Sequence, residues 1–250
     1  IWTAPNPRFS HVKLALLRVN GETRTIQSSP PVIVDPAPPP ANQLYPSTVA
    51  NANGVTVAWE DRRRGHTVLM HSHSPDAKRF AAPAILNDQV ARRTTKYGKG
   101  LGAMRVILAP YGDHGVAAAW LDKRTFTEAY DVYAGFSSDG RRFGKNQKVQ
   151  DDFATGAAQW HAAIAGDRSS RVAIAWDDAR DGDADIWISW LEGGGWSSNT
   201  NVPGASGPGW QTDPTVTLDA GGNLHMAWIE RAEHNGPTRL RYALGTPLRE

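Results

Sequence analysis

The chain has 250 residues, a formal net charge of +2 at pH 7 and no cysteine. This length makes one large domain or at most two small ones, and the balanced charge argues against nucleic acid as the main partner. The missing cysteines exclude disulfides, thiolate metal sites and a Cys nucleophile. Because the apolar runs are only as long as strands, we expect no transmembrane segment.

The first 44 residues predict a partial structural unit. Apolar runs over Val12–Val19 and Val32–Val34 are typical of strands, and the Pro-rich stretch over Pro30–Pro46 indicates an extended connector. The chain starts at Ile1 without a Met or a signal peptide. We therefore expect a processed or excised part of something longer, within a larger chain or a complex.

From residue 45 onward one pattern occurs four times. Its anchor is a short apolar run that ends in Ala-Trp, at Trp59, Trp120, Trp176 and Trp228. One strand-like run precedes each anchor and others follow it, so each copy predicts short strands joined by tight turns. We expect the four tryptophans in the core, because a buried indole removes a large apolar area from water. The copies span residues 45–100, 101–156, 157–206 and 207–250.

Four-stranded units that repeat at roughly this period are typical of propeller blades. We therefore predict a single all-β domain, a β-propeller of four-stranded antiparallel blades with four repeats and a partial N-terminal blade. A two-sheet sandwich is the alternative. Two forms of ring stay open: the N-terminal strands complete the last blade, or the chain is part of a larger propeller.

Three copies continue after the anchor as Trp-x-Asp-x-Arg, which brings in Arg63, Arg124 and Arg180. Side chains at positions i and i+2 share a strand face, so each Asp and Arg can pair or reach the next blade. One interpretation is a staple between blades. The other is that the three arginines converge on the axis and bind a carboxylate.

A turn with its own signature closes two copies, as Ser-x-Asp-x-x-Arg-Phe over 74–80 and 137–143. With the stretch over 172–190, these turns resemble those of the sialidase-like (BNR, or Asp-box) β-propellers. The resemblance covers residues 45–245 and implies that the Asp-box turns are structural. It also implies a bacterial protein located outside the cytoplasm, in the periplasm, at the cell surface or secreted.

The resemblance implies one enzymatic hypothesis, an exo-glycosidase that hydrolyses a carboxylated sugar. Its arginine triad would be Arg63, Arg124 and Arg180, as nominated above. The nucleophile would be Tyr130 paired with Glu128, and Asp122 or Asp61 would be the acid. The Arg-Ile-Pro motif of the family is absent.

That departure favours a second hypothesis as the main prediction: a non-catalytic module that binds a protein or glycan partner. The rim loops differ between copies and carry the aromatic side chains of Tyr97, Phe126 and Trp210. Loops placed by a rigid scaffold are where binding residues concentrate. We therefore predict these three residues as the binding surface.

One loop has the composition of a cation site. Asp181, Asp183 and Asp185 alternate with small residues, and such oxygen ligands can wrap Ca²⁺. A solvated turn is the alternative, and no other cofactor is predicted. His71 and His73 would share a strand face, but no third ligand is evident, so we expect both on the surface.

Overall fold

The computed structural model describes residues 1–5, 8–88, 102–124, 129–151, 156–233 and 235–246. Every regular element in these ranges is a β-strand, which confirms the all-β prediction. Tyr97, Phe126 and Glu128 lie outside the described residues. No described segment forms a helix of the length and apolarity that crossing a membrane requires.

The strands form successive antiparallel sheets. The first sheet contains β1 (Trp2–Pro5), β2 (Ser10–Leu14) and β5 (Val32–Ile33), with β3 (Leu17–Asn20) and β4 (Thr25–Ser28) as a separate hairpin. The next contains β6 (Gln43–Asn51), β7 (Gly54–Asp61), β8 (Val68–Ser74) and β9 (Ala84–Ile85). It is followed by β10 (Ala103–Tyr111), β11 (Gly115–Asp122), β12 (Asp131–Ser137) and β13 (Gln147–Lys148).

The last two sheets keep the same order of strands. One contains β14 (Gln159–Gly166), β15 (Val172–Asp178) and β16 (Asp185–Glu192), with β17 (Gly195–Trp196) and β18 (Thr200–Asn201) both paired to β16. The other contains β19 (Trp210–Leu218), β20 (Leu224–Arg231) and β21 (Arg239–Gly245). Each of the four sheets that begin with β6, β10, β14 and β19 contains one of the repeated tryptophans in its second strand.

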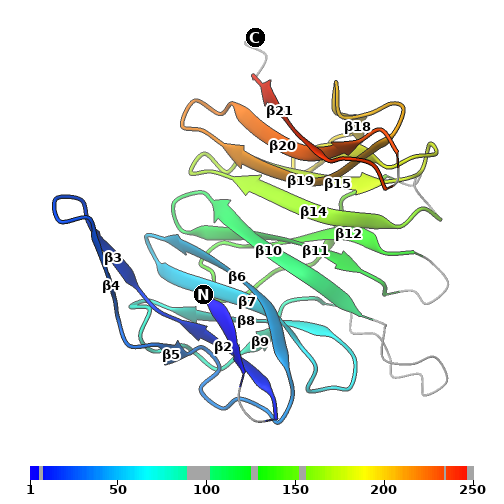
Figure 1. Cartoon of the computed structure of the whole chain (residues 1–250). Coiled ribbons are helices and arrows are strands. Elements are labelled where there is room, and N and C mark those ends of the chain that lie inside the picture. The colour runs from blue at the N-terminus through cyan, green and yellow to red at the C-terminus, as the bar shows by residue number, and fades with distance from the viewer. Residues whose placement is uncertain (6–7, 89–101, 125–128, 152–155, 234, 247–250) are drawn as a thin grey trace.

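The sheets stack one on the next from the N-terminal strands to the C-terminal ones (Figure 1). Their first strands, β6, β10, β14 and β19, pack against one another in that order, and we call this side of the stack the inner edge. The four repeated tryptophans are buried, and each belongs to a different apolar cluster. Their predicted core role is confirmed.

The N-terminal strands do not complete the last sheet. Strand β1 pairs with β2, and both pack against β6 at the opposite end of the stack from β21. Within the described residues, β21 pairs only with β20 and leaves Leu240 and Tyr242 exposed. The alternative in which the N-terminal strands close a small ring with the last blade is therefore wrong.

The two Asp-box-like turns lie at the end of the sheets where β7 and β11 begin, since Ser74 pairs with Val55 and Ser137 with Val116. In the first turn the Asp76 carboxylate accepts the backbone N–H groups of Lys78 and Arg79. These bonds lower the pKa of Asp76 to about 2. A carboxylate used in this way closes a turn.

Candidate functional site

Each inner strand contains a bulge at the same place. In β6 the register shifts between Leu44 and Ser47, and the corresponding shifts in β10, β14 and β19 have the same size. Two residues of the inner strand therefore lie opposite one residue of the next strand, and that one residue is the repeated tryptophan. Each repeat therefore combines a large buried indole with a β-bulge in the strand opposite it.

The first residue of each bulge has a left-handed backbone, although none is a glycine. The four residues, which we call the bulge cluster, are Tyr45 (φ 48°), Arg105 (φ 58°), His161 (φ 46°) and Asp213 (φ 55°). A left-handed backbone is costly for such residues and is concentrated at functional sites. The backbone feature is repeated while the side chains are all different, so we infer that these positions are diversified for binding or chemistry.

Contacts join the members of the bulge cluster from sheet to sheet. The guanidinium carbon of Arg105 lies 3.7 Å from the centroid of the Tyr45 ring. His161 Nε2 lies 3.5 Å from Oδ1 of Asp213, and the charge of Arg105 acts on His161. Tyr45 and Arg105 therefore form one contact pair on the inner edge, His161 and Asp213 form another, and the charge of Arg105 links the two pairs electrostatically.

Two buried carboxylates form hydrogen bonds with the backbone of the bulge cluster. Glu60 and Asp177 directly follow the repeated tryptophans of their sheets, and each is only 3% exposed. Glu60 Oε1 accepts the backbone N–H of Arg105 at 2.8 Å, and Asp177 Oδ1 accepts that of Asp213 at 3.0 Å. Each carboxylate thus holds the bulge of the following sheet in place.

The same carboxylates set the electrostatics of the site. Burial raises the pKa of Glu60. The hydrogen bond that Nδ1 of His161 donates to the Asp177 carboxylate, at 2.8 Å, raises the pKa of that imidazole. Among the described residues, no carboxylate forms an ion pair with Arg105, so its guanidinium is available to an anionic ligand.

Aromatic side chains border the cluster. The rings of Tyr130 and Trp160 lie 5.5 Å apart, and Trp160 is 40% exposed although it occupies the position just before His161. Burial is the main cause that raises the pKa of Tyr130, and the negative charge of Glu60 adds to it. Exposed rings beside polar groups are typical of a small-molecule site.

The three arginines nominated from the sequence lie elsewhere. Each pairs with the Asp two positions before it: Arg63 with Asp61 at 2.8 Å, Arg124 with Asp122 at 2.7 Å, and Arg180 with Asp178 at 2.6 Å. Each also pairs with an Asp that follows the last strand of the preceding sheet, namely Asp35, Asp88 and Asp151 in turn. Each of these arginines therefore joins its own sheet to the preceding one through a pair of aspartates, as the staple interpretation expected.

The other nominated residues have separate surroundings. Asp122 and Asp61 are buried, and each accepts the indole N–H of the tryptophan two positions before it, so both belong to the staples. Tyr130 lies beside the bulge cluster, as described above. Trp210 begins β19 opposite Arg231 and is partly buried.

The aspartates nominated for calcium do not form a recognisable cation site. Asp185 accepts the backbone N–H of Gly207, and burial raises its pKa, with Asp181 adding repulsion. No group of three or more acidic or histidine side chains in the described part of the chain has the geometry to hold a metal ion. Calcium binding by this loop stays a prediction.

The bulge cluster was missed from the sequence, although a signal exists. Tyr45 precedes its repeated tryptophan by 14 residues, and Arg105, His161 and Asp213 precede theirs by 15. Aligning the copies on Ala-Trp would have shown one column filled with Tyr, Arg, His and Asp. Four different chemical groups in one column of a repeat indicate diversification rather than packing.

No protein-family model matches the sequence, and no curated protein matches it. Solved structures do share its fold. An α-L-arabinanase of Penicillium chrysogenum complexed with arabinobiose is 10% identical with a TM-score of 0.63, over 96% of this chain and 74% of its own. The α-L-arabinofuranosidase Arb93A of Fusarium graminearum, bound to an iminosugar inhibitor, is 11% identical with a TM-score of 0.58, over 98% and 70%.

A PL25 ulvan lyase, bound to a glucuronate-containing saccharide, is 12% identical with a TM-score of 0.54, over 80% of this chain and 55% of its own. At such identities the likeness concerns the fold alone. The chain therefore shares an all-β fold with these proteins, and the likeness does not single out the sialidase-like superfamily.

The prediction of a non-catalytic binding module is contradicted by these likenesses, because the chain shares its fold with glycoside hydrolases. The exo-glycosidase alternative agrees better with them. The physical reason for the error is that sequence reasoning looked for chemistry in the rim loops and in the staple arginines. The polar side chains instead come from the bulges of the inner strands.

Proposed function

We propose that the chain is a glycoside hydrolase that binds its sugar at the bulge cluster. The observation that carries the proposal is the repeated left-handed bulge, which presents Tyr45, Arg105, His161 and Asp213 together beside buried carboxylates. A propeller with one inner strand from each blade at a common edge suits such a site. A glycan substrate also fits the expected location outside the cytoplasm, which belongs to the same proposal.

Two carboxylates in different surroundings provide the pair that glycoside hydrolysis needs. Glu60 is buried and has a raised pKa, so it suits the role of general acid. Asp213 has a half-exposed side chain next to His161 and suits the role of base or nucleophile. His161, held by Asp177, is then a positioning residue that orients the side chain of Asp213.

The remaining members of the site suit a sugar ring. Tyr45 and Trp160 are partly exposed rings, 48% and 40%, that offer flat apolar faces. Arg105 forms no ion pair with a described acid, although its charge acts on the buried Glu60, and this favours a sugar with an anionic substituent. Arg105 thus takes the role for which the sequence suggested Arg63, Arg124 and Arg180.

The test is a hydrolysis assay on aryl glycosides, arabinan and uronate-containing oligosaccharides, with release of reducing ends as the readout. D213N and E60Q should each lower kcat by about 10²–10⁴-fold, while D113N, at the opposite end of the sheets, should leave it unchanged. Unchanged activity in D213N and E60Q would overturn the proposal. So would products carrying the ultraviolet absorbance of an unsaturated uronate, because they come from elimination and not from hydrolysis.

The sialidase-like mechanism makes a separate prediction. If Tyr130 were the nucleophile, Y130F would abolish turnover as completely as D213N. With Asp213 in that role, Y130F should weaken substrate binding and retain most of kcat, because the ring of Tyr130 still packs on Trp160. Comparing kcat and KM of the two variants therefore distinguishes the mechanisms.

A further inference from the structure

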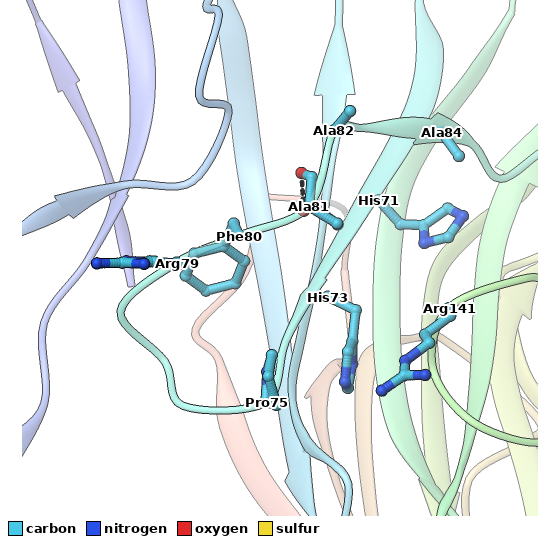
Figure 2. Close-up of a pocket in the computed structure, with 10 residues that line it drawn as sticks. His71, His73, Pro75, Arg79, Phe80, Ala81, Ala82, Ala84 and Arg141 are labelled. Atoms are coloured by element: carbon cyan, nitrogen blue, oxygen red, sulfur yellow. Dashed lines mark hydrogen bonds between the residues drawn. The ribbon is translucent and has the colours of Figure 1, made fainter.

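A cavity lies on the outer side of the stack, away from the bulge cluster. It has a volume of about 360 Å³ and is formed by β8, by the segment that leads to β9, and by the Asp-box-like turn of the next sheet. Figure 2 shows the side chains of His71, His73 and Arg141 together on one side of β8, while Arg79 points away from them. The cavity therefore draws its polar groups from two neighbouring sheets.

His71 and His73 form the floor of this cavity. Both are buried, so the prediction that they lie on the surface is wrong. Thr56 Oγ1 lies 3.0 Å from Nδ1 of His73, and the carbonyl oxygen of Asn53 lies 3.1 Å from its Nε2, so both ring nitrogens of His73 are engaged. His71 differs from it. Its ring packs edge-on against Phe143, and its Nδ1 is buried with no hydrogen-bond partner among the described residues.

The wall supplies a positive charge. Arg141 is exposed on the Asp-box-like turn, and no described carboxylate forms an ion pair with its guanidinium. Asp139, in the same turn, already accepts the backbone N–H of Arg141 and is bonded to the Ser137 hydroxyl. Among the described residues, no Asp or Glu lines the cavity. Arg79 also lines the cavity but points away from the histidines (Figure 2), so Arg141 is the cationic group that lies beside them.

The rest of the lining is apolar. Phe80, Ala81, Ala82 and Ala84 border the cavity beside the cationic group. A pocket of this kind, mostly apolar with a few convergent polar groups, suits a ligand with one charged substituent on a compact body. A guanidinium binds planar oxyanions in a bidentate manner.

We propose that this cavity is a second binding site, for a sugar residue that carries an oxyanion, either a carboxylate or a sulfate ester. Arg141 binds the oxyanion, the imidazole of His71 supplies a further polar contact, and Phe80 packs against the sugar ring. The site is separate from the bulge cluster and does not depend on catalysis there. It would hold an acidic glycan on the outer face of the stack.

The test uses NMR titration of the full chain with D-glucuronate, galactose 6-sulfate and glucose. The acidic sugars should shift the resonances of the His71 imidazole, while glucose should not. R141Q should weaken the binding by about tenfold or more. R142Q removes the same charge from the next position of the same turn, which does not line the cavity, and should bind as the unmodified chain does.

The R105Q variant distinguishes binding at this cavity from binding at the bulge cluster. In the R105Q variant the His71 shifts should persist, because Arg105 belongs to the other site. Whichever acidic sugar binds more tightly identifies the oxyanion. Absence of His71 shifts with both acidic sugars would overturn the proposal, and so would equal affinities of R141Q and R142Q.

Discussion

Nδ1 of His161 lies 2.8 Å from Oδ1 of Asp177, a carboxylate that is almost fully buried. The same oxygen accepts the backbone N–H of Asp213 at 3.0 Å. One buried acid therefore fixes the ring of one bulge residue and the backbone of the next. This connects the strained backbone of two sheets to the electrostatics of the site they share.

The first prediction concerns the charge of His161. Replacing Asp177 with Asn keeps an oxygen that can accept a hydrogen bond and removes the charge, so the pKa of His161 should fall toward its ordinary value. NMR titration of the His161 imidazole measures this change. D181N, whose carboxylate does not contact His161, should leave the pKa unaltered. A His161 pKa that is the same in D177N and in the unmodified chain would show that Asp177 is not its cause.

The sign of the effect on stability follows from the direction of the shift. A histidine whose pKa is raised by folding stabilises the native state at low pH, below its ordinary value, and this contribution disappears as the pH rises through the raised pKa. In D177N the His161 contribution should therefore be smaller below pH 6.5, the ordinary value for this imidazole. Denaturant titrations at several pH values measure the difference.

The second prediction concerns the staples. The side chain of Arg180 is 5% exposed, and it pairs with the fully buried Asp178 at 2.6 Å. R180M leaves that carboxylate buried without its counter-ion, so the free energy of unfolding should fall by about 3–5 kcal/mol. R168M, at an exposed position, is the matched control and should have little effect.

A double variant makes this prediction sharper. In R180M/D178N the buried charge is absent, while an amide oxygen still accepts the indole N–H of Trp176. Most of the stability lost in R180M should therefore return. If the double variant were no more stable than R180M, the loss would come from the packing of Arg180 on Trp187 and not from the unpaired charge.

Sequence reasoning anticipated the repeat well and the site poorly. Trp59 and its equivalents, the alternating strands and the pairing of Asp61 with Arg63 are local patterns, visible within a few residues. The second partner of Arg63 is Asp35, which comes from another sheet, so no local pattern could predict it. The staple itself was one of the two interpretations considered.

The bulge cluster escaped notice because a bulge is a property of strand register. The backbone of Arg105 is left-handed only because two residues of β10 lie opposite Trp120 in β11. Its side chain contacts Tyr45 of another sheet, and its backbone N–H donates a hydrogen bond to the carboxylate of Glu60. Composition and alternation carry none of this information, whereas alignment of the copies on their tryptophans carries part of it.

The third prediction arises from the imperfect fourth copy. Trp59, Trp120 and Trp176 donate their indole N–H groups to an Asp two positions later, at 2.9–3.1 Å. In the fourth copy that position is Glu230, and Nε1 of Trp228 is buried with no partner among the described residues. The longer side chain of Glu230 instead pairs with Arg241 at 3.4 Å.

Shortening this side chain should restore the missing bond. E230D should raise the free energy of unfolding by about 1 kcal/mol, because the buried N–H of Trp228 gains an acceptor. E192D, at an exposed strand end, makes the same chemical change without an indole to satisfy. Equal or lower stability of E230D, relative to the unmodified chain, would show that the fourth copy cannot adopt the geometry of the other three.

The last prediction concerns acid stability and His71. Burial lowers the pKa of this imidazole to about 4, from an ordinary value of 6.5. Above pH 6.5 the ring is neutral in both states, and its contribution to stability is fully present. As the pH falls from 6.5 toward 4, the unfolded chain binds a proton that the folded chain does not, so stability is lost. The full loss amounts to about 3 kcal/mol, and roughly 2 kcal/mol of it should be present at pH 5.

H71F keeps an aromatic ring against Phe143 and cannot titrate. The free energy of unfolding should therefore fall by about 2 kcal/mol more in the unmodified chain than in H71F between pH 7.5 and pH 5. Because His73 is common to both proteins, its own titration cancels in the comparison. Equal losses in the two proteins would mean that the His71 imidazole is protonated in the folded chain, and that the floor of the outer cavity carries a charge.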